Sequence, residues 1–281
     1  TRSEIAEAGR RAPASSIAET FARAYDYIFR IQGEDMFWEG ELEGNVSLAV
    51  ETYLMYLKTG FGTEDRKRGL IGYIRNEQGS DGGWPLYKDG PGDLSITVEA
   101  YWGLKLAGDD VNAPHMKKAR DLILSKGGAG NARVLTTIYM AMFGQVSWRV
   151  VPAIPPEIMF VPVWTRLSIY EFANWARGVI VPNSILFAKR VSWDLGPRGD
   201  LSELFVRDAG GGRIMKKHAK TPASVEKGFA HGILAATFGV IDDFLHFYEG
   251  LPGIFRPFRR AAIRRAENWV IAHQEPKGRW Y

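Results

Sequence analysis

A seven-residue pattern with glutamine in its first place, glycine in its fifth and tryptophan in its seventh occurs twice in this chain. Each copy follows a run of helical periodicity, so the glycine can supply the left-handed backbone that ends a helix. The tryptophan offers a large apolar face and one N–H donor, and the glutamine offers both a donor and an acceptor. We expect each copy to tie a helix end to its neighbour, although a helix cap beside a core tryptophan would share the pattern. The copies comprise Gln78, Gly82 and Trp84, and then Gln274, Gly278 and Trp280.

A third, degenerate copy lies near the N-terminus. Gln32 and Trp38 keep the spacing, but Met36 stands where the other copies have glycine. Gln32 precedes Gln78 by 46 residues, which is the length of two helices with their turns. A turn that recurs at this distance is typical of a helical repeat array.

The composition is that of a globular protein without cysteine chemistry. Of its 281 residues, 46% are hydrophobic, which suffices for one large domain or two small ones. The absence of cysteine excludes disulfides, thiolate metal sites and a cysteine nucleophile. The five histidines lack ligand spacing, so no metal is expected. The net charge of +4 comes from interspersed charges of both signs, which indicates a solvated surface and no nucleic-acid partner.

Helical periodicity predicts an all-α fold. Ser15 or Ser16 caps a first helix that reaches Ile31. Further helices are predicted over 46–58, 63–78, 94–107, 113–125 and 131–144, of which 94–107 and 131–144 are largely apolar and 113–125 is amphipathic and charged. Inner and outer helices that alternate in this way form a double ring in which one ring hides inside the other. We treat residues 1–281 as a single domain of this kind.

The periodicity breaks at Gln145. A proline-rich, aromatic segment excludes a regular helix until about Ser168. Residues 167–190 are apolar again, with a break expected at Pro182. The polar, glycine-rich stretch over 193–219 is predicted to run over the surface, and it does not favour phosphate binding because no strand precedes its glycines and no Lys-Ser/Thr follows them.

Residues 223–255 contain the most apolar helix candidate. Glu226, Asp242 and Asp243 exclude an ordinary bilayer span, so the helix either belongs to the core or dips into one leaflet of a membrane. An adjoining basic cluster favours the membrane surface, because anionic headgroups attract such a flank, but it also fits a solvated helix face. The cluster contains Arg256, Arg259, Arg260, Arg264 and Arg265.

Several stretches resemble bacterial squalene–hopene cyclases, in the order in which that family has them. They are Thr97–Tyr101, Gly127-Gly128 through Val134, Pro155–Phe160 and Ile169–Arg177, and the glutamine–tryptophan pattern is similar to the QW motifs of triterpene cyclases. The resemblance runs from about Ala18 to Trp280. It implies a fold of two α/α barrels, of which this chain supplies most of the N-terminal one.

The same resemblance implies a monotopic enzyme of the bacterial inner membrane that cyclises squalene or a similar polyprenoid without a cofactor. In that family an Asp-x-Asp-Asp acid starts the carbocation cascade. This chain lacks the motif, because Ala107 and Val240 stand where the leading aspartate would precede its two Asp-Asp pairs. We therefore expect no catalytic residue here and a C-terminal cyclase domain in the same or another chain. A chain that starts without methionine also suggests a piece of something longer. The resemblance is compatible with a homodimer.

The resemblance assigns two sets of residues to a site. Trp175, Phe172, Ile180 and Tyr139 match positions that line the cyclisation cavity or its entrance, where an indole face stabilises a passing cation. Glu51, Glu99 and Arg133 match a polar network near the water that ends the cascade. The alternatives are a core tryptophan at Trp175 and an inter-helix ion cluster at Arg133. A non-catalytic α/α-barrel scaffold or lipid-binding module is the alternative for the whole chain.

Overall fold

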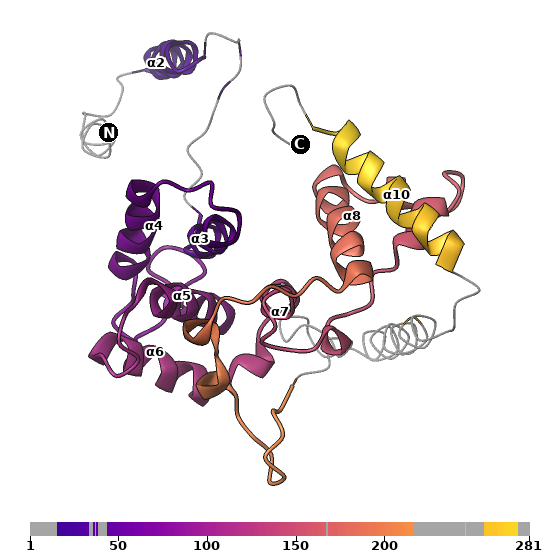
Figure 1. Ribbon diagram of the computed structural model, residues 1–281. Helices are drawn as coiled ribbons and strands as arrows, with labels where there is room; N and C mark the ends of the chain where they lie inside the picture. The colour runs from indigo at the N-terminus through magenta and orange to yellow at the C-terminus, as the bar shows by residue number, and fades with distance from the viewer. Residues whose placement is uncertain are drawn as a thin grey trace, which may run out of the picture. The chain divides into compact units, whose positions relative to one another are not determined.

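The computed structural model describes residues 16–33, 36, 38, 44–166, 168–215, 245 and 256–274 (Figure 1). The chain divides into two compact units, 1–43 and 44–281. Over the described ranges it is helical apart from one two-stranded antiparallel sheet and isolated bridges. The all-α prediction therefore holds in outline, whereas closure of the helices into a barrel stays a prediction.

The first unit contains the helix α2 (Ile17–Arg30). The Ser16 side chain caps it by accepting a backbone hydrogen bond from the first turn at 3.2 Å, as the sequence predicts. Along one side, Tyr25 stacks near Phe29 with ring centroids 4.4 Å apart, and Phe29 meets Trp38 edge-on at 6.2 Å. These rings link the helix to the degenerate turn that follows it.

In the second unit, inner and outer helices alternate along the chain. Every residue from Ser95 to Leu104 of α5 is buried, whereas α6 buries only Met116, Ala119 and Ile123. The ribbon places α5 among α3, α4 and α6, and its residues contact all three (Figure 1). The elements are α3 (Ser47–Thr59), α4 (Glu64–Asn76), β1 (Trp84–Pro85), β2 (Gly92–Asp93), α5 (Leu94–Ala107), α6 (Pro114–Ser125), η1 (Ala129–Asn131) and α7 (Val134–Met142).

The turn that follows α4, over 78–84, joins three helices by hydrogen bonds of Gln78 and Trp84. The amide of Gln78 donates to the carbonyls of Gly82 at 2.8 Å and His115, in the first turn of α6, at 3.0 Å. Trp84 is fully buried, and its indole N–H donates to the carbonyl of Ile74 in α4 at 2.7 Å. Its backbone N–H donates to the Thr97 hydroxyl of α5 at 3.1 Å. The turn therefore ties the end of α4 to α5 and α6.

The degenerate turn in the first unit repeats this geometry. The Gln32 amide donates to the carbonyl four residues on, at Met36, and the Trp38 indole donates to the carbonyl four residues before the glutamine, at Ile28. The distances are 2.9 and 2.7 Å. Met36 has φ 65° where Gly82 has φ 87°, so the left-handed conformation persists without the glycine. Gln274 follows the last described helix, whereas Gly278 and Trp280 lie outside the described residues.

The proline-rich segment forms short 3-10 turns, which confirms the prediction that its described residues, 145–166, form no regular α-helix. It leads into α8, which packs beside α10 (Figure 1). A second apolar cluster lies between these elements, with Met159, Ile169, Val181, Ala266 and Trp269 at its centre. The elements are η2 (Trp148–Val150), η3 (Pro156–Phe160), η4 (Ile169–Glu171), α8 (Asn174–Lys189) and α10 (Arg256–Ala272).

The expected break at Pro182 is wrong, because α8 runs through it. Proline removes one backbone donor and crowds the carbonyl four residues earlier, which here belongs to Gly178. Side chains in the next turn form extra bonds along the same stretch: the Asn183 amide donates to the Val179 carbonyl at 2.8 Å, and the Ser184 hydroxyl donates to the Val181 carbonyl at 2.7 Å. The helix thus remains bonded on both sides of the proline.

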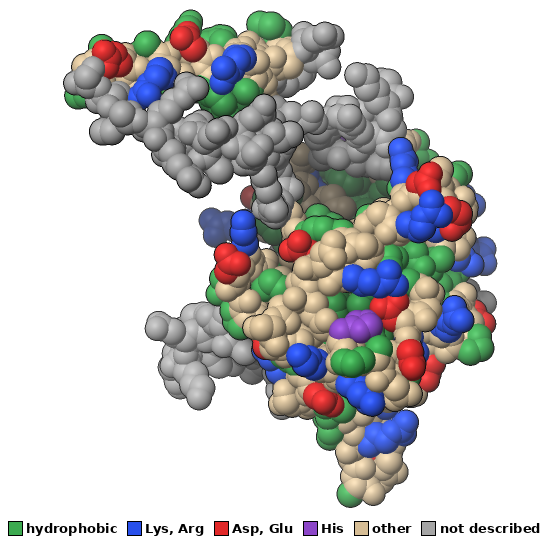
Figure 2. Space-filling view, turned by 90° about the vertical axis from the view of Figure 1, so that its left-hand side faces the viewer, with side chains coloured by type: hydrophobic (Ala, Val, Ile, Leu, Met, Phe, Trp, Pro, Cys, Tyr) green, Lys and Arg blue, Asp and Glu red, His purple; other side chains and the backbone are tan. Residues whose placement is uncertain are grey.

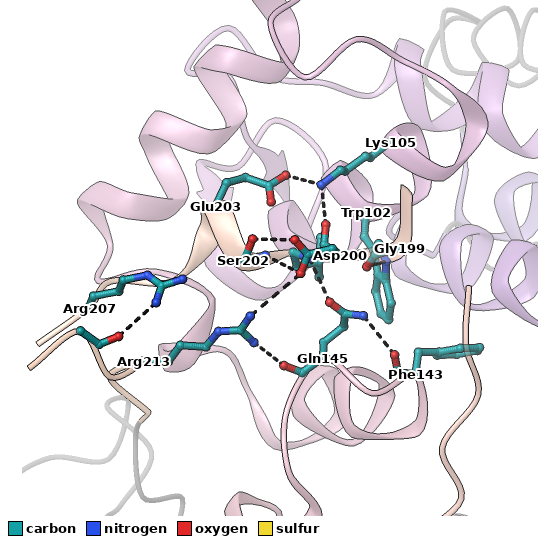
Figure 3. Close-up of polar contacts among 12 residues, drawn as sticks. Trp102, Lys105, Phe143, Gln145, Gly199, Asp200, Ser202, Glu203, Arg207 and Arg213 are labelled. Carbon is teal, nitrogen blue, oxygen red and sulfur yellow. Dashed lines mark hydrogen bonds and ion pairs between the residues drawn. The ribbon is translucent and has the colours of Figure 1, made fainter. Parts of the chain in front are cut away.

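The prediction that 193–219 runs over the surface is wrong for 199–206, whereas Asp194 and residues 196–198 are exposed. Leu201, Leu204 and Phe205 are buried, and the stretch contains η5 (Pro197–Gly199) and η6 (Ser202–Leu204). Figure 3 shows how α5 holds it: the Trp102 indole donates to the Gly199 carbonyl at 3.0 Å. Leu201, Leu204 and Phe205 have the spacing of one helix face. They span only five residues between glycine-rich and charged stretches, so the glycines and charges dominate the sequence pattern.

The visible face of the second unit carries Lys and Arg interspersed with Asp and Glu, with apolar side chains between them (Figure 2). This agrees with the predicted mixed surface. In the part of the chain that the structure describes, every helix is too short or too polar to cross a membrane. The predicted apolar helix over 223–255 lies outside that part, apart from Leu245.

Candidate functional site

Three inner helices of the second unit bring the predicted polar residues together. Glu51 comes from α3, Glu99 from α5, and Arg133 from the position that caps α7. Tyr139, further along α7, joins them by a hydrogen bond to the Glu51 carboxylate. The structure thus groups four of the predicted site residues, including one that the resemblance assigned to the cavity wall.

Arg133 and Glu99 form the centre of this polar cluster. Nη2 of Arg133 lies 3.5 Å from Glu99 Oε1 and donates to the Ser47 hydroxyl at 2.9 Å. The Thr136 hydroxyl donates to the same carboxylate oxygen of Glu99. The Glu99 side chain is only 2% exposed, whereas that of Arg133 is 35% exposed. A buried carboxylate is therefore held between a cation and a hydroxyl, as a buried charge requires.

Two polar atoms of this pair have no hydrogen-bond partner among the described residues. They are Glu99 Oε2, an acceptor, and Arg133 Nε, a donor, and both are buried. Buried polar atoms in folded proteins are nearly always bonded to protein or to ordered water. The cluster can therefore bind a small polar molecule, such as water, that accepts a hydrogen bond from Arg133 Nε and donates one to Glu99 Oε2.

The carboxylate of Glu51 has an unusual acidity. Burial and the neighbouring charge of Glu99 raise its pKa from 4.5 to about 7, against the opposing effects of the Tyr139 hydroxyl and Arg133. Burial and the charge of Glu51 in turn raise the pKa of Tyr139, so this phenol stays protonated and donates. Glu51 can therefore exchange a proton near neutral pH, which is a property of functional carboxyls.

Ser47, Ser95 and Thr136 are members of the cluster that the sequence analysis missed. The Ser95 hydroxyl accepts from the Arg133 backbone N–H at 2.8 Å, and so fixes the start of α7 against α5. A signal for the two serines was present, because each stands one helical turn before a site glutamate: Ser47 before Glu51 and Ser95 before Glu99. Residues four apart share one helix face, so this spacing marks a polar stripe on two otherwise apolar helices.

The other predicted cavity residues lie between the residues just before α8 and the middle of that helix. The Trp175 side chain is 77% exposed and Phe172 is 41% exposed, so neither is a core residue of the described chain. Ile180 packs against the second apolar cluster. The indole of Trp175 is thus exposed in the described structure, and its assignment to a cavity wall or to a core stays a prediction.

Comparisons with known proteins identify the family of the chain. The family model described as the squalene–hopene cyclase N-terminal domain matches residues 21–281. The chain belongs to the squalene–hopene cyclase family. It is 36% identical over 267 residues to the squalene–hopene cyclase of Alicyclobacillus acidocaldarius, a match that covers 95% of this chain and 40% of that protein.

Further relatives extend this family to other cyclases. The chain is 37% identical over 276 residues to the squalene–hopene cyclase of Bradyrhizobium diazoefficiens, covering 95% of this chain and 39% of that protein. It is 32% identical over 272 residues to the dammaradiene synthase of Dryopteris crassirhizoma, covering 96% of this chain and 38% of that protein. The chain thus spans about two fifths of the length of these squalene–hopene cyclase family relatives.

Proposed function

We propose that this chain forms the N-terminal barrel of a class II triterpene cyclase, which converts squalene or a similar polyprenoid to hopene or hopanol through a proton-initiated carbocation cascade. Family membership and the activities for which the relatives are named support the reaction class. The observation that carries the role of this chain is the buried Glu99–Arg133 pair, with one unpartnered acceptor and one unpartnered donor among the described residues.

In this proposal the polar cluster acts where the cascade ends. A water molecule held by Glu99 Oε2 and Arg133 Nε either adds to the final cation or takes a proton from it. Glu51, with its pKa of about 7, then accepts the proton that the water releases. The exposed face of Trp175 would line the path of the cation, where a desolvated indole contributes about 2 kcal/mol of stabilisation.

The initiating acid lies outside this chain in the proposal, in the same or another chain. Asp109 is unsuited to that role. Although burial alone would raise its pKa, hydrogen bonds from Arg75 and His115 lower it below the usual range. The His115 contact is 2.9 Å, and Arg75 Nε donates to the carboxylate at 3.1 Å. Such a carboxylate stays ionised and cannot protonate an alkene.

Two assays with squalene test this assignment. The chain alone should yield no pentacyclic product, because it lacks the acid. A chimaera in which the chain replaces the matched region of the Alicyclobacillus acidocaldarius enzyme should yield hopene or hopanol. In the chimaera, Glu99→Gln should change the hopanol-to-hopene ratio severalfold. Glu77→Gln, at the exposed C-terminal cap of α4, is the control and should leave the ratio unchanged.

Three outcomes would contradict the proposal. Product from the chain alone would place an initiating acid within it. An unchanged product ratio in Glu99→Gln would remove the cluster from the termination step. A folded chimaera that binds squalene without converting it would favour the non-catalytic scaffold or lipid-binding module.

We further propose that the enzyme works at the bacterial inner membrane as a monotopic protein. The apolar composition of 223–255 and the basic residues that follow it support this.

A further inference from the structure

A cavity of about 580 Å³ opens in the second unit between the C-terminal ends of α7 and α8 and the stretch around Arg213. The two helix ends are joined here, because the Trp193 N–H donates to the Met142 carbonyl at 2.7 Å. The cavity shares no residue with the Glu51–Glu99–Arg133 cluster. Its volume lies in the range of pockets that hold a whole small molecule, well above the space of a single ion.

The charged residues in the cavity wall are all arginines. Arg149, Arg190 and Arg213 contribute to it together with the hydroxyls of Ser147 and Ser192, and no Asp or Glu belongs to its described lining. The two helix C-termini carry partial negative charges of about half a unit each. They offset about one of the three positive charges, and Asp200, 4.0 Å from Arg213 at the edge, offsets part of another. Among its described residues the cavity wall therefore presents guanidinium groups and hydroxyls but no carboxylate.

Arg213 is fixed in place before any ligand binds. Its Nη1 donates to the Gln145 carbonyl at 2.6 Å (Figure 3). Its guanidinium carbon lies 4.5 Å from the centroid of the Phe205 ring. The Gln145 carbonyl and the Phe205 ring thus fix the guanidinium, which keeps further N–H groups for another acceptor. Such preorganisation lowers the entropy lost when an anion binds.

Arg190 occupies a backbone conformation that disfavours its side chain. It ends α8 with φ 46°, in the left-handed region where helices usually place glycine. A residue with a side chain costs about 1 kcal/mol there relative to glycine. An arginine at this strained position points to a use for its side chain beyond ending the helix.

The remaining wall is apolar, with Val146, Trp148, Val150 and Met215 contributing to it. We propose that the cavity binds a phosphoryl group attached to an apolar body, with the arginines and serines around the phosphoryl oxygens and the apolar wall along the body. Guanidinium groups match phosphate oxygens in pairs of N–H donors. The site differs from a phosphate-binding glycine loop, because Gly210, Gly211 and Gly212 are not part of its lining.

Calorimetric titration with three probes tests this assignment. Dihexanoyl phosphatidic acid below its micellar concentration supplies a free phosphorylated amphiphile, inorganic phosphate supplies the anion alone, and phosphatidylglycerol vesicles supply the headgroup in a bilayer. The free amphiphile should bind at least tenfold more tightly than inorganic phosphate. Binding to the vesicles alone would assign the phosphoryl group to a membrane lipid only where Arg149→Gln weakens that binding, because the segment 223–255 is itself proposed to attach the chain to such vesicles.

Arginine variants separate this pocket from general charge attraction. Arg149→Gln and Arg213→Gln should each weaken binding about tenfold or more, because each loses charge-assisted hydrogen bonds. Arg66→Gln, on the exposed face of α4, removes the same charge elsewhere and should bind like the unaltered chain. Arg213→Lys keeps the charge and the fold but loses the paired donors, and should show an intermediate loss.

Two results would overturn the proposal. One is the absence of binding by all three probes up to about 10 mM, a concentration at which even weak arginine sites for phosphate are occupied. The other is an equal affinity in Arg66→Gln and Arg149→Gln. Circular dichroism at 222 nm identifies any variant that loses helix. If Arg213→Gln does so, the affinity of Arg149→Gln decides, because Arg149 is exposed and its replacement should leave the fold intact.

Discussion

At the residue scale, Glu51 is the side chain whose charge state most depends on folding. Burial and the charge of Glu99 raise its pKa from 4.5 to about 7. The folded chain therefore binds this proton more tightly than the unfolded chain, so the stabilisation is full below about pH 4.5 and is lost as the pH rises through 7. We expect the free energy of unfolding to fall by about 1–2 kcal/mol across this range, after allowance for solvent screening.

Urea unfolding at several pH values and constant ionic strength measures this loss. Glu51→Gln should remove it, because the amide does not titrate, whereas Glu77→Gln should keep the pH profile of the unaltered chain. Parallel profiles for Glu51→Gln and the unaltered chain would show that Glu51 titrates alike in both states.

The Glu99–Arg133 pair predicts a coupling between two substitutions. Arg133→Met should cost about 2–4 kcal/mol, because it leaves two carboxylates without their cation. Glu99→Gln should cost about 1–3 kcal/mol. The double variant should be less destabilised than the sum by about 1 kcal/mol or more, measured by urea unfolding. Additive costs within about 0.5 kcal/mol would mean that the 3.5 Å contact stores no net energy.

At the scale of elements, the glutamine–tryptophan turn occurs in a buried and an exposed form with the same hydrogen bonds. Trp84 is fully buried, whereas Trp38 is 50% exposed. Trp84→Phe should cost about 2–3 kcal/mol, because it leaves the buried carbonyl of Ile74 unpaired and opens a small cavity. Trp38→Phe loses an equivalent bond to Ile28, but water can replace it, so the cost should stay below about 1 kcal/mol.

Chemical denaturation followed by circular dichroism compares these two variants directly. Equal costs would show that the turn stabilises by its own geometry and independently of burial. Trp84→Ala should destabilise the chain more than Trp84→Phe, because it removes the apolar face as well as the N–H group.

Elements with their own start and stop signals were predicted well. The helix over 94–107 was placed at its observed bounds, because Asp93 caps its first turn with bonds of 2.9 and 3.0 Å and Gly108 ends it with φ 105°. The helix predicted over 63–78 covers Glu64–Asn76, with Thr63 and Glu77 as its caps. The glutamine–tryptophan pattern predicts that Gln78 ties this helix end to a neighbour, but that the neighbour is α6 depends on tertiary packing, which no local pattern indicates.

The polar cluster shows the same division between local and tertiary signals. Each glutamate and its preceding serine could be read from the spacing on one helix, but Thr136 contacts Glu99 only because α5 and α7 lie side by side. The stretch over 195–206 was missed for a related reason. Its burial depends on Trp102 and Tyr101 of α5, about a hundred residues earlier in the chain.

At the scale of the whole molecule, the exposed aromatic side chains bear on what the chain contacts. Trp164 and Trp175 are 83% and 77% exposed, and both lie in or beside the segment between η3 and α8. Large apolar groups exposed close together in sequence are unusual for a surface that meets only water. Trp175 is the one of the two that the proposed function assigns to the cyclisation cavity.

Membrane attachment is the last property at this scale, and it depends on the apolar residues within 223–255. If this segment inserts into one leaflet, replacing Phe238, Phe244 and Phe247 together by serine removes most of its apolar area and should abolish flotation with phosphatidylglycerol vesicles. Phe61→Ser removes an 85% exposed phenyl ring from the α3–α4 loop and should leave flotation unchanged. Arg149→Gln should also float, because a cationic pocket contributes little beside three buried rings. Unchanged flotation of the triple variant would assign attachment to another surface.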